Sequence, residues 1–264
     1  MQRIERDALA AHLRAALVNM PSVDAAWEGG SAAFHKLDPY SDLDLVLVVA
    51  DDAVQTVFDG VEAALTALSP IALRYDVPGT VGYSQRFYSF RDAPEFLVLD
   101  LVSMRRSDPL LFREVELHGN GQSWLDRTGI LQEAHVDPVA DQAAAVARVP
   151  QLRAAFAMFQ HIPTKERLRG RTVEALHFYQ AMTVRPLVEA LRLWHCPQRR
   201  GFAVRYLARD LPAPVVQRIE ELSFVHDLLD LQTKHTQAQE WFWETMGNIE
   251  RQGPGGGASG PQPA

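Results

Sequence analysis

Two aspartates, Asp42 and Asp44, stand one residue apart where the apolar run from Leu45 to Ala50 begins. Because side chains alternate between the two faces of a strand, both carboxylates project to the same side, roughly 7 Å apart along the backbone. Carboxylate oxygens are hard ligands, which Mg²⁺ accepts together with the oxygens of a bound phosphate. The spacing therefore indicates a site for a magnesium-bound phosphate compound.

A glycine turn precedes these acids, with Gly29 and Gly30 followed by Ser31. Glycine lets backbone N–H groups approach a phosphate closely, and the Ser31 hydroxyl can donate a further hydrogen bond. The turn and the two carboxylates together favour a bound triphosphate. The alternatives are an ordinary tight turn at the glycines and a polar turn at the strand start, capped by Ser41 and Asp42.

A third acid, Asp100, interrupts an otherwise apolar strand that we predict from Phe96 to Met104. A buried carboxylate without a partner is costly, so we expect Asp100 to be linked to a metal or paired with an arginine such as Arg86 or Arg91. Glu95 is a weaker candidate for a catalytic base because a turn residue is solvated.

These residues resemble a known family. Gly30 and Ser31, the segment Ser41-Asp42-Leu43-Asp44 and the later strand acid are similar to motifs of the nucleotidyltransferase superfamily related to DNA polymerase β. The resemblance covers the first part of the chain. It implies that Asp42 and Asp44 hold a pair of catalytic Mg²⁺ ions, with Asp100 as a third ligand or as the base.

The same resemblance implies that Gly30 and Ser31 bind the β- and γ-phosphates of a nucleotide, with Ser41 in the same nucleotide-binding motif. Family members often carry a second glycine five residues after the first motif glycine, where this chain has His35. The difference concerns the shape of the phosphate loop and leaves the carboxylates intact.

The second half of the chain resembles the substrate domain of bacterial aminoglycoside and lincosamide adenylyltransferases. The segments that carry this resemblance are Arg169-Gly170-Arg171, Arg185-Pro186-Leu187 and residues 205–212. It implies transfer of AMP from ATP, or of another nucleoside monophosphate, to a hydroxyl group of a small molecule, with release of pyrophosphate. A transferase acting on RNA or protein, and a nucleotide-binding module without turnover, are the alternatives.

Composition limits the partners. The 264 residues are 47% hydrophobic and 22% charged, typical of a globular chain with room for two domains. A net charge of -7 and a pI near 5.7 disfavour nucleic acid as a partner. The lone Cys196 excludes a disulfide framework within the chain and fits the cytoplasm. We find neither a signal peptide nor a membrane-spanning run, and a homodimer is left open.

Hydrophobic periodicity places the elements that position these acids. We expect strands at residues 23–27, 43–49, 71–77, 85–90 and 96–104, with helices at residues 4–18 and 53–68, the latter capped by Asp51 and Asp52. Beyond residue 107 we expect helices at residues 137–161, 164–194 (capped by Thr164 and kinked at Pro186), 202–207, 214–224 and 225–246, and one further short strand at residues 123–125.

The fold class that follows is α+β. A polymerase β-like mixed-sheet domain (residues 1–130) is followed by an all-α helical bundle (residues 131–250). Residues 251–264 are rich in Gly, Pro, Ser, Gln and Ala, and we expect them to form a disordered tail.

Overall fold

The structure is a computed structural model, and it describes residues 3–257. The chain divides into two compact units, residues 1–136 and 137–264. The first unit contains a mixed sheet and the second is helical, so the fold is α+β as predicted.

The first unit is built on a six-stranded sheet with the order β3-β4-β5-β2-β1-β6. The strands are β1 (Val23–Glu28), β2 (Leu43–Val49), β3 (Ile71–Asp76), β4 (Tyr83–Phe90), β5 (Val98–Arg105) and β6 (Gln122–Asp126). Strands β2 and β5 run parallel, whereas the other neighbouring pairs are antiparallel. Strand β2 lies in the interior of the sheet, between β5 and β1.

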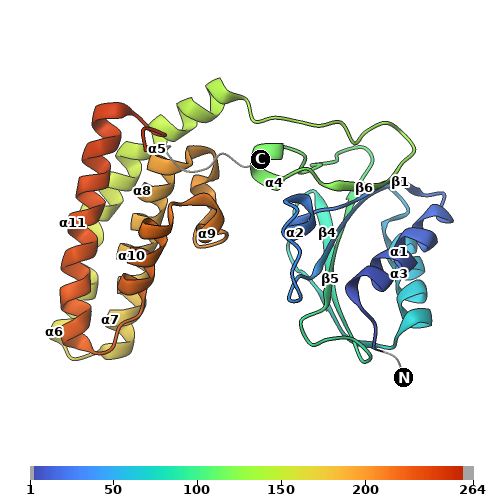
Figure 1. The fold of residues 1–264 in the computed structure, drawn as a ribbon, viewed down its shortest axis with the longest axis horizontal. Coiled ribbons are helices and arrows are strands. Elements are labelled where there is room, and N and C mark those ends of the chain that lie inside the picture. The colour runs from blue at the N-terminus through green and yellow to red at the C-terminus, as the bar shows by residue number, and fades with distance from the viewer. Residues whose placement is uncertain (1–2, 258–264) are drawn as a thin grey trace. The chain divides into compact units, whose positions relative to one another are not determined.

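Alternation along β2 separates the two faces of the sheet. Leu43, Leu45 and Leu47 are fully buried in the main core, which they share with α1 (Arg6–Val18) and α3 (Val54–Leu68). Both helices lie on the same side of the sheet (Figure 1). Asp44, Val46 and Val48 therefore face the other side.

That second face carries a smaller apolar cluster around Ala25, Trp27, Val48 and Met104. Two short helices belong to this unit, α2 (Gly30–Ala33) and α4 (Val115–His118). The segment after α4 lies against α2, since the Asn120 N–H donates to the Ala33 carbonyl at 2.9 Å. The first unit thus presents a face that helices α1 and α3 leave uncovered.

The second unit is all helical. Its elements are α5 (Pro138–Phe159), α6 (His161–Leu168), α7 (Thr172–Tyr179), the π-helix η1 (Gln180–Val184), α8 (Arg185–His195), the 3₁₀ helix η2 (Pro197–Phe202), α9 (Leu207–Asp210), α10 (Ala213–Ser223) and α11 (Leu228–Gln252). The Asp137 carboxylate caps α5, because it accepts from the N–H groups of Val139 and Ala140. Phe156 of α5 stacks on Phe242 of α11 in the core.

Two predicted helix caps are wrong. The residue before α3 is Ala53, and no side chain caps this helix; the Asp51 carboxylate instead accepts from the Ser107 N–H at 3.0 Å. Thr164 lies inside α6, where its hydroxyl donates to the Gln160 carbonyl. In both places the side chain predicted to cap a helix forms another hydrogen bond instead. Asp51 bonds to a distant loop residue, and Thr164 bonds to a carbonyl within its own helical stretch.

The single helix predicted for residues 164–194 is wrong as well. It breaks at Gly170, whose φ of +69° ends the helical path after α6. The chain then widens into η1 before Pro186, a residue that lacks the N–H needed for a helical hydrogen bond. The Met182 carbonyl accepts instead from the Gln160 side chain at 2.8 Å.

Two further differences concern turns and the tail. The helix predicted at residues 202–207 is a turn between η2 and α9, where Ala203 and Tyr206 have positive φ angles. We predicted disorder from residue 251, but α11 continues to Gln252 and the Gly255 N–H donates to the Leu193 carbonyl at 2.9 Å. Residues 258–264 of the predicted tail lie outside the described residues.

Among residues 3–257, none of the helices combines the length and the apolar character that crossing a membrane requires.

Candidate functional site

Asp44 and Asp100 are direct partners in the parallel pairing of β2 with β5. Residues paired in register point to the same side of a sheet, so both carboxylates lie on the face opposite α1 and α3. Asp42 precedes β2 by one residue and contacts the Asp44 carboxyl. The structure thus brings together the three acids that the sequence singled out.

The surroundings of Asp42, Asp44 and Asp100 disfavour negative charge on all three carboxylates at once. Burial raises the pKa of Asp44 to about 7, and the charges of Asp42 and Asp100 add to the shift, as does a hydrogen bond with Asp42; only Arg6 opposes it. Burial also raises the pKa of Asp100, although hydrogen bonding from Gln85 counters this. Such mutual repulsion is what a bound cation relieves.

The donor set fits a hard cation, since carboxylate oxygens are the ligands that Mg²⁺ prefers. The set is not assembled into a ready-made cage, because no group of three or more His, Cys, Asp or Glu side chains in the part of the chain that the structure describes is positioned to hold a metal. Cation binding would therefore require the carboxylates to move together.

Gly30 packs directly against Asp44. It begins α2 with a φ of +55°, a conformation that favours glycine, and an added Cβ would lie 1.6 Å from Oδ2 of Asp44. The preceding Gly29 N–H donates to the Asp44 carbonyl at 2.9 Å, which fixes the turn to the start of β2. Ser31 follows on α2 and is half-buried beside this turn.

Ser41 is engaged locally. Its hydroxyl donates to the Asp38 carboxylate and accepts from the Asp38 N–H, both at 2.9 Å. The hydroxyl therefore stabilises the turn before β2. His35, which occupies the position of the second motif glycine, has a φ of +53°. The backbone at this position adopts the left-handed conformation that a glycine accepts without strain.

Gln85 of β4 is a site residue that the sequence analysis did not identify. Its amide nitrogen donates to both oxygens of Asp100, at 2.7 and 2.9 Å. Arg86, proposed as an ion-pair partner of Asp100, instead pairs with Glu62 and Asp76. Gln85 projects to the same face of the sheet as its diagonal neighbour Asp100, but the two meet only because β4 pairs with β5, and strand alternation does not specify that pairing.

Arg6 is a second residue that was missed. Its Nε donates to the Asp42 carbonyl at 2.8 Å, and its Nη2 pairs with the carboxylate of Glu28, which is only 3% exposed. Arg6 thereby ties the start of α1 to the end of β1 and to the turn that carries Asp42. A local sequence pattern cannot predict this contact, because Arg6 and Asp42 are 36 positions apart in the chain.

The charged residues of the second unit form internal contacts. Arg169 and Arg171 both pair with the buried Glu166. The Asp210 side chain is buried, and its carboxylate accepts from Arg192, Arg199 and Arg209. Of the segments that resemble the substrate domain of adenylyltransferases, two therefore carry ion pairs that hold the helices of this unit together.

Neither a protein-family profile nor a curated protein sequence matches the chain. Two solved structures are similar to it in general fold. One is an aminoglycoside 6-adenyltransferase from Bacillus subtilis, with 13% identity, a TM-score of 0.40, and coverage of 98% of this chain and 94% of that chain. The other is a nucleotidyltransferase-like protein from Exiguobacterium sibiricum 255-15, with 11% identity, a TM-score of 0.39, and coverage of 94% and 77%.

Proposed function

We propose that this protein is a nucleotidyltransferase that transfers a nucleoside monophosphate, AMP from ATP, to a hydroxyl group of a small molecule. The observation that carries the proposal is the convergence of Asp42, Asp44 and Asp100 on one face of the sheet, with the glycine turn at Gly30 against Asp44. Carboxylates beside a glycine turn are suited to binding a cation together with a phosphate chain.

Asp42 and Asp44 would hold Mg²⁺, and Asp100 is a candidate third ligand. Burial, together with the charges of Asp42 and Asp100, raises the pKa of Asp44 to about 7, and a bound cation would offset this repulsion. When bound, Mg²⁺ would supply positive charge to offset the charge that develops on the phosphate oxygens.

The chain's own residues account for the remaining chemistry. Gly30 has no side chain and so leaves room for the Asp44 carboxylate at the turn, where the Ser31 hydroxyl can donate a hydrogen bond to a phosphate oxygen. Asp100 accepts the proton of the acceptor hydroxyl, whose oxygen bonds to the α-phosphorus as the bond to the bridging oxygen of pyrophosphate breaks. Gln85 keeps the Asp100 carboxylate in one orientation through its two hydrogen bonds.

A small molecule is the proposed acceptor because the net charge of -7 disfavours RNA. Aminoglycosides and lincosamides are the acceptors that the sequence resemblance suggests, which would make the protein an antibiotic-modifying enzyme of the cytoplasm.

The test is pyrophosphate release from each nucleoside triphosphate in the presence of Mg²⁺ and a panel of aminoglycosides, lincosamides and polyols. We expect turnover with at least one pair, and a loss of roughly 100-fold or more in the Asp44→Asn and Asp100→Asn variants. The matched control is Asp108→Asn, because Asp108 is exposed and lies outside the site.

Unchanged turnover in Asp44→Asn would contradict the proposed site. Calorimetric binding of ATP without pyrophosphate release for any acceptor would instead favour a nucleotide-binding module. Transfer to RNA or protein, included as further acceptors, would replace the small molecule in the proposal.

A further inference from the structure

One row of paired residues crosses the sheet from the glycine turn to the edge strand β3. Asp44 of β2 pairs with Asp100 of β5, and Asp100 pairs in turn with Phe87 of β4. Phe87 pairs with Tyr75 on β3. At the other end of the row, the Gly29 N–H donates to the Asp44 carbonyl at 2.9 Å. Because paired residues project to one face of a sheet, the two carboxylates and the two aromatic rings share a face.

The neighbouring residues on β3 and β4 show which face the rings occupy. Arg74 and Arg86 both form ion pairs with Glu62 of α3, so these two side chains point to the side of the sheet that α3 covers. Tyr75 and Phe87 are the next residues along the two strands and therefore project to the opposite side. The rings lie on the face that α1 and α3 leave uncovered.

This aromatic part of the face is accessible and uncharged. Tyr75 is 54% exposed and Leu73 is 66% exposed, whereas Phe87 is half-buried. Strands β3 and β4 lie wholly within the described residues, and none of the side chains that they place on this face is charged: Leu73, Tyr75, Tyr83, Gln85, Phe87 and Ser89. Exposed apolar surface that continues from a candidate active site is typical of a surface that binds a ligand.

The proposed reaction determines which end of the row an acceptor occupies. The acceptor oxygen bonds to the α-phosphorus on the side opposite the pyrophosphate, whose bond to phosphorus breaks, and the hydroxyl proton passes to Asp100. In the proposed function the phosphates lie at the glycine turn, on the α2 side of Asp44. The acceptor therefore lies on the Asp100 side, where Phe87 and then Tyr75 follow along the row.

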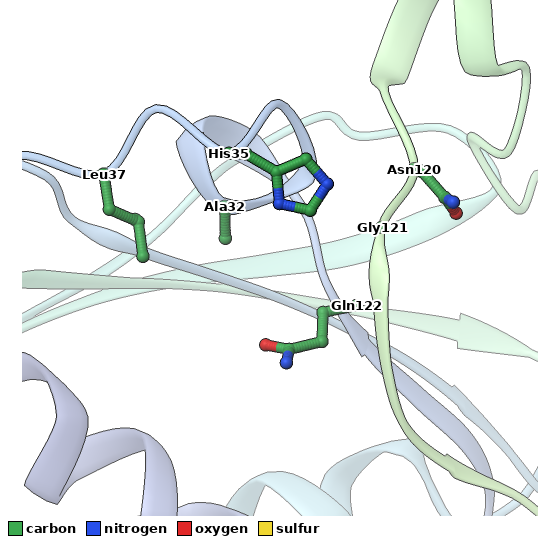
Figure 2. A pocket seen from close by; sticks show the side chains of 6 residues that line it. All are labelled: Ala32, His35, Leu37, Asn120, Gly121 and Gln122. Carbon is green, nitrogen blue, oxygen red and sulfur yellow. The ribbon is translucent and has the colours of Figure 1, made fainter. Parts of the chain in front are cut away.

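The surface on the α2 side has a different character. A pocket of about 520 Å³ lies beside α2, and its lining includes an imidazole and two amides (Figure 2): Ala32, His35, Leu37, Asn120, Gly121 and Gln122. Figure 2 shows the His35 ring projecting from the α2 side towards residues 120–122. Polar groups thus line the α2 side of the row, and aromatic rings lie on the β3 side.

We propose that Phe87 and Tyr75 form a platform that binds the acceptor and selects an uncharged ring next to the reacting hydroxyl over a polycation. The inference rests on the proposed function and narrows its acceptor class. Adjacent strands lie about 4.8 Å apart, so a ring that packs on Phe87 is within reach of Asp100. Aromatic side chains stabilise such a ring by removing apolar surface from water. The further ammonium groups of an aminoglycoside find no acid among the residues that β3 and β4 place on this face.

The test uses phenyl β-D-glucoside as the uncharged ring compound, glucose as the matched compound without the ring, and the aminoglycoside kanamycin as the polycation. Binding to the full chain is measured by ligand-observed NMR titration. We expect the wild type to bind phenyl glucoside about tenfold or more tightly than glucose, because only the former has an apolar ring to bury.

Two variants remove the rings of the platform. We expect Tyr75→Ser and Phe87→Leu each to weaken phenyl glucoside binding by about fivefold or more, and to leave the weak binding of glucose within about twofold. The matched control is Val81→Ser, which removes an exposed apolar side chain from the loop between β3 and β4, beyond the far end of the platform. Tyr75 is exposed, so its variant remains informative if Phe87→Leu fails to fold in a thermal unfolding control.

Kinetics separate a binding role from a general structural fault. With phenyl glucoside as the acceptor, both variants should raise KM by the same factor as the dissociation constant and change kcat by less than about twofold. A higher kcat/KM for kanamycin than for phenyl glucoside would overturn the acceptor class.

The two proposals fail in different ways. Equal affinities for phenyl glucoside in the wild type, Tyr75→Ser and Phe87→Leu, or no binding by the wild type, would overturn the platform even if nucleotidyl transfer occurs. Binding that both variants weaken, in a protein without transfer to any acceptor, would support the platform as a surface for uncharged rings and refute the proposed function.

Discussion

Gly30 and Asp44 lie so close together that a Cβ on residue 30 would be 1.6 Å from the Oδ2 atom of Asp44. The glycine is needed for its positive φ of +55° and, independently, to leave space for the carboxylate. The sequence assigns Gly30 to phosphate binding, whereas the structure shows that it also fixes where Asp44 lies. The turn and the acid therefore form one unit.

We expect Gly30→Ala to lower transfer activity by roughly 100-fold or more, because the methyl group would displace the Asp44 carboxylate. The matched control is Gly29→Ala. A Cβ there would meet only the Asp44 Cβ, at an ordinary 3.9 Å, and the φ of Gly29 is -99°. Pyrophosphate release by both variants is the measurement. Equal activities would show that the position of Asp44 does not depend on Gly30.

Strand alternation predicts that Asp42 and Asp44 project to the same side, whereas only the family resemblance placed Asp100 with them. Asp44 and Asp100 each interrupt an apolar strand, and a parallel register brings them side by side. Gln85 and Arg6 could not be predicted, because their contacts depend on which strands and helices become neighbours. Sequence periodicity specifies the faces of an element but not its partners.

Substitution of Arg6 tests how much its ion pair with Glu28, next to the turn that carries Asp42, contributes to stability. We expect Arg6→Met to destabilise the protein by about 3 kcal/mol, since it leaves the buried Glu28 carboxylate without its cation. The double variant Arg6→Met/Glu28→Gln should recover part of this loss, because the unpaired charge is gone. Urea unfolding of the wild type, both single variants and the double variant gives the coupling free energy. Strict additivity would show that the pair contributes no coupling.

His35 provides a test of backbone strain in the phosphate loop. We expect His35→Gly to stabilise the protein by about 0.5–1 kcal/mol, because glycine adopts the φ of +53° without a steric penalty. Lys36→Gly is the control: Lys36 is an exposed neighbour whose φ is not positive, so glycine there should be neutral or destabilising. Thermal unfolding measures both, and a destabilised His35→Gly variant would show that contacts of the imidazole outweigh the strain.

The helical unit was harder to predict than the sheet. Its long apolar pattern at residues 164–194 does not show that Gly170 would end a helix or that η1 would precede Pro186. The path of the chain in this region is set by buried polar contacts between helices that are far apart in the sequence. Gln160 donates to the Met182 carbonyl and accepts from Thr183 and His235. Apolar periodicity carries no information about such a network.

His235, a member of that network, makes the stability of the fold depend on pH. It is 5% exposed, and burial, with a smaller effect of the Arg167 charge, lowers its pKa to about 4. Its Nε2 lies 2.9 Å from the Gln160 amide oxygen, which can only accept, so the neutral ring donates there. In the unfolded chain the pKa returns to about 6.5.

Between pH 6.5 and about 4, the unfolded chain therefore binds a proton that the folded chain does not. The stability contributed by neutral His235 is complete above pH 6.5 and decreases by about 3 kcal/mol as the pH falls through this window. His235→Gln keeps a donor but cannot titrate, so its free energy of unfolding should fall less steeply from pH 6.5 to 4 than that of the wild type. The exposed His226→Asn serves as the control and should retain the wild-type slope. Parallel slopes for the wild type and His235→Gln, measured by urea unfolding at each pH, would mean that His235 becomes protonated without loss of the fold.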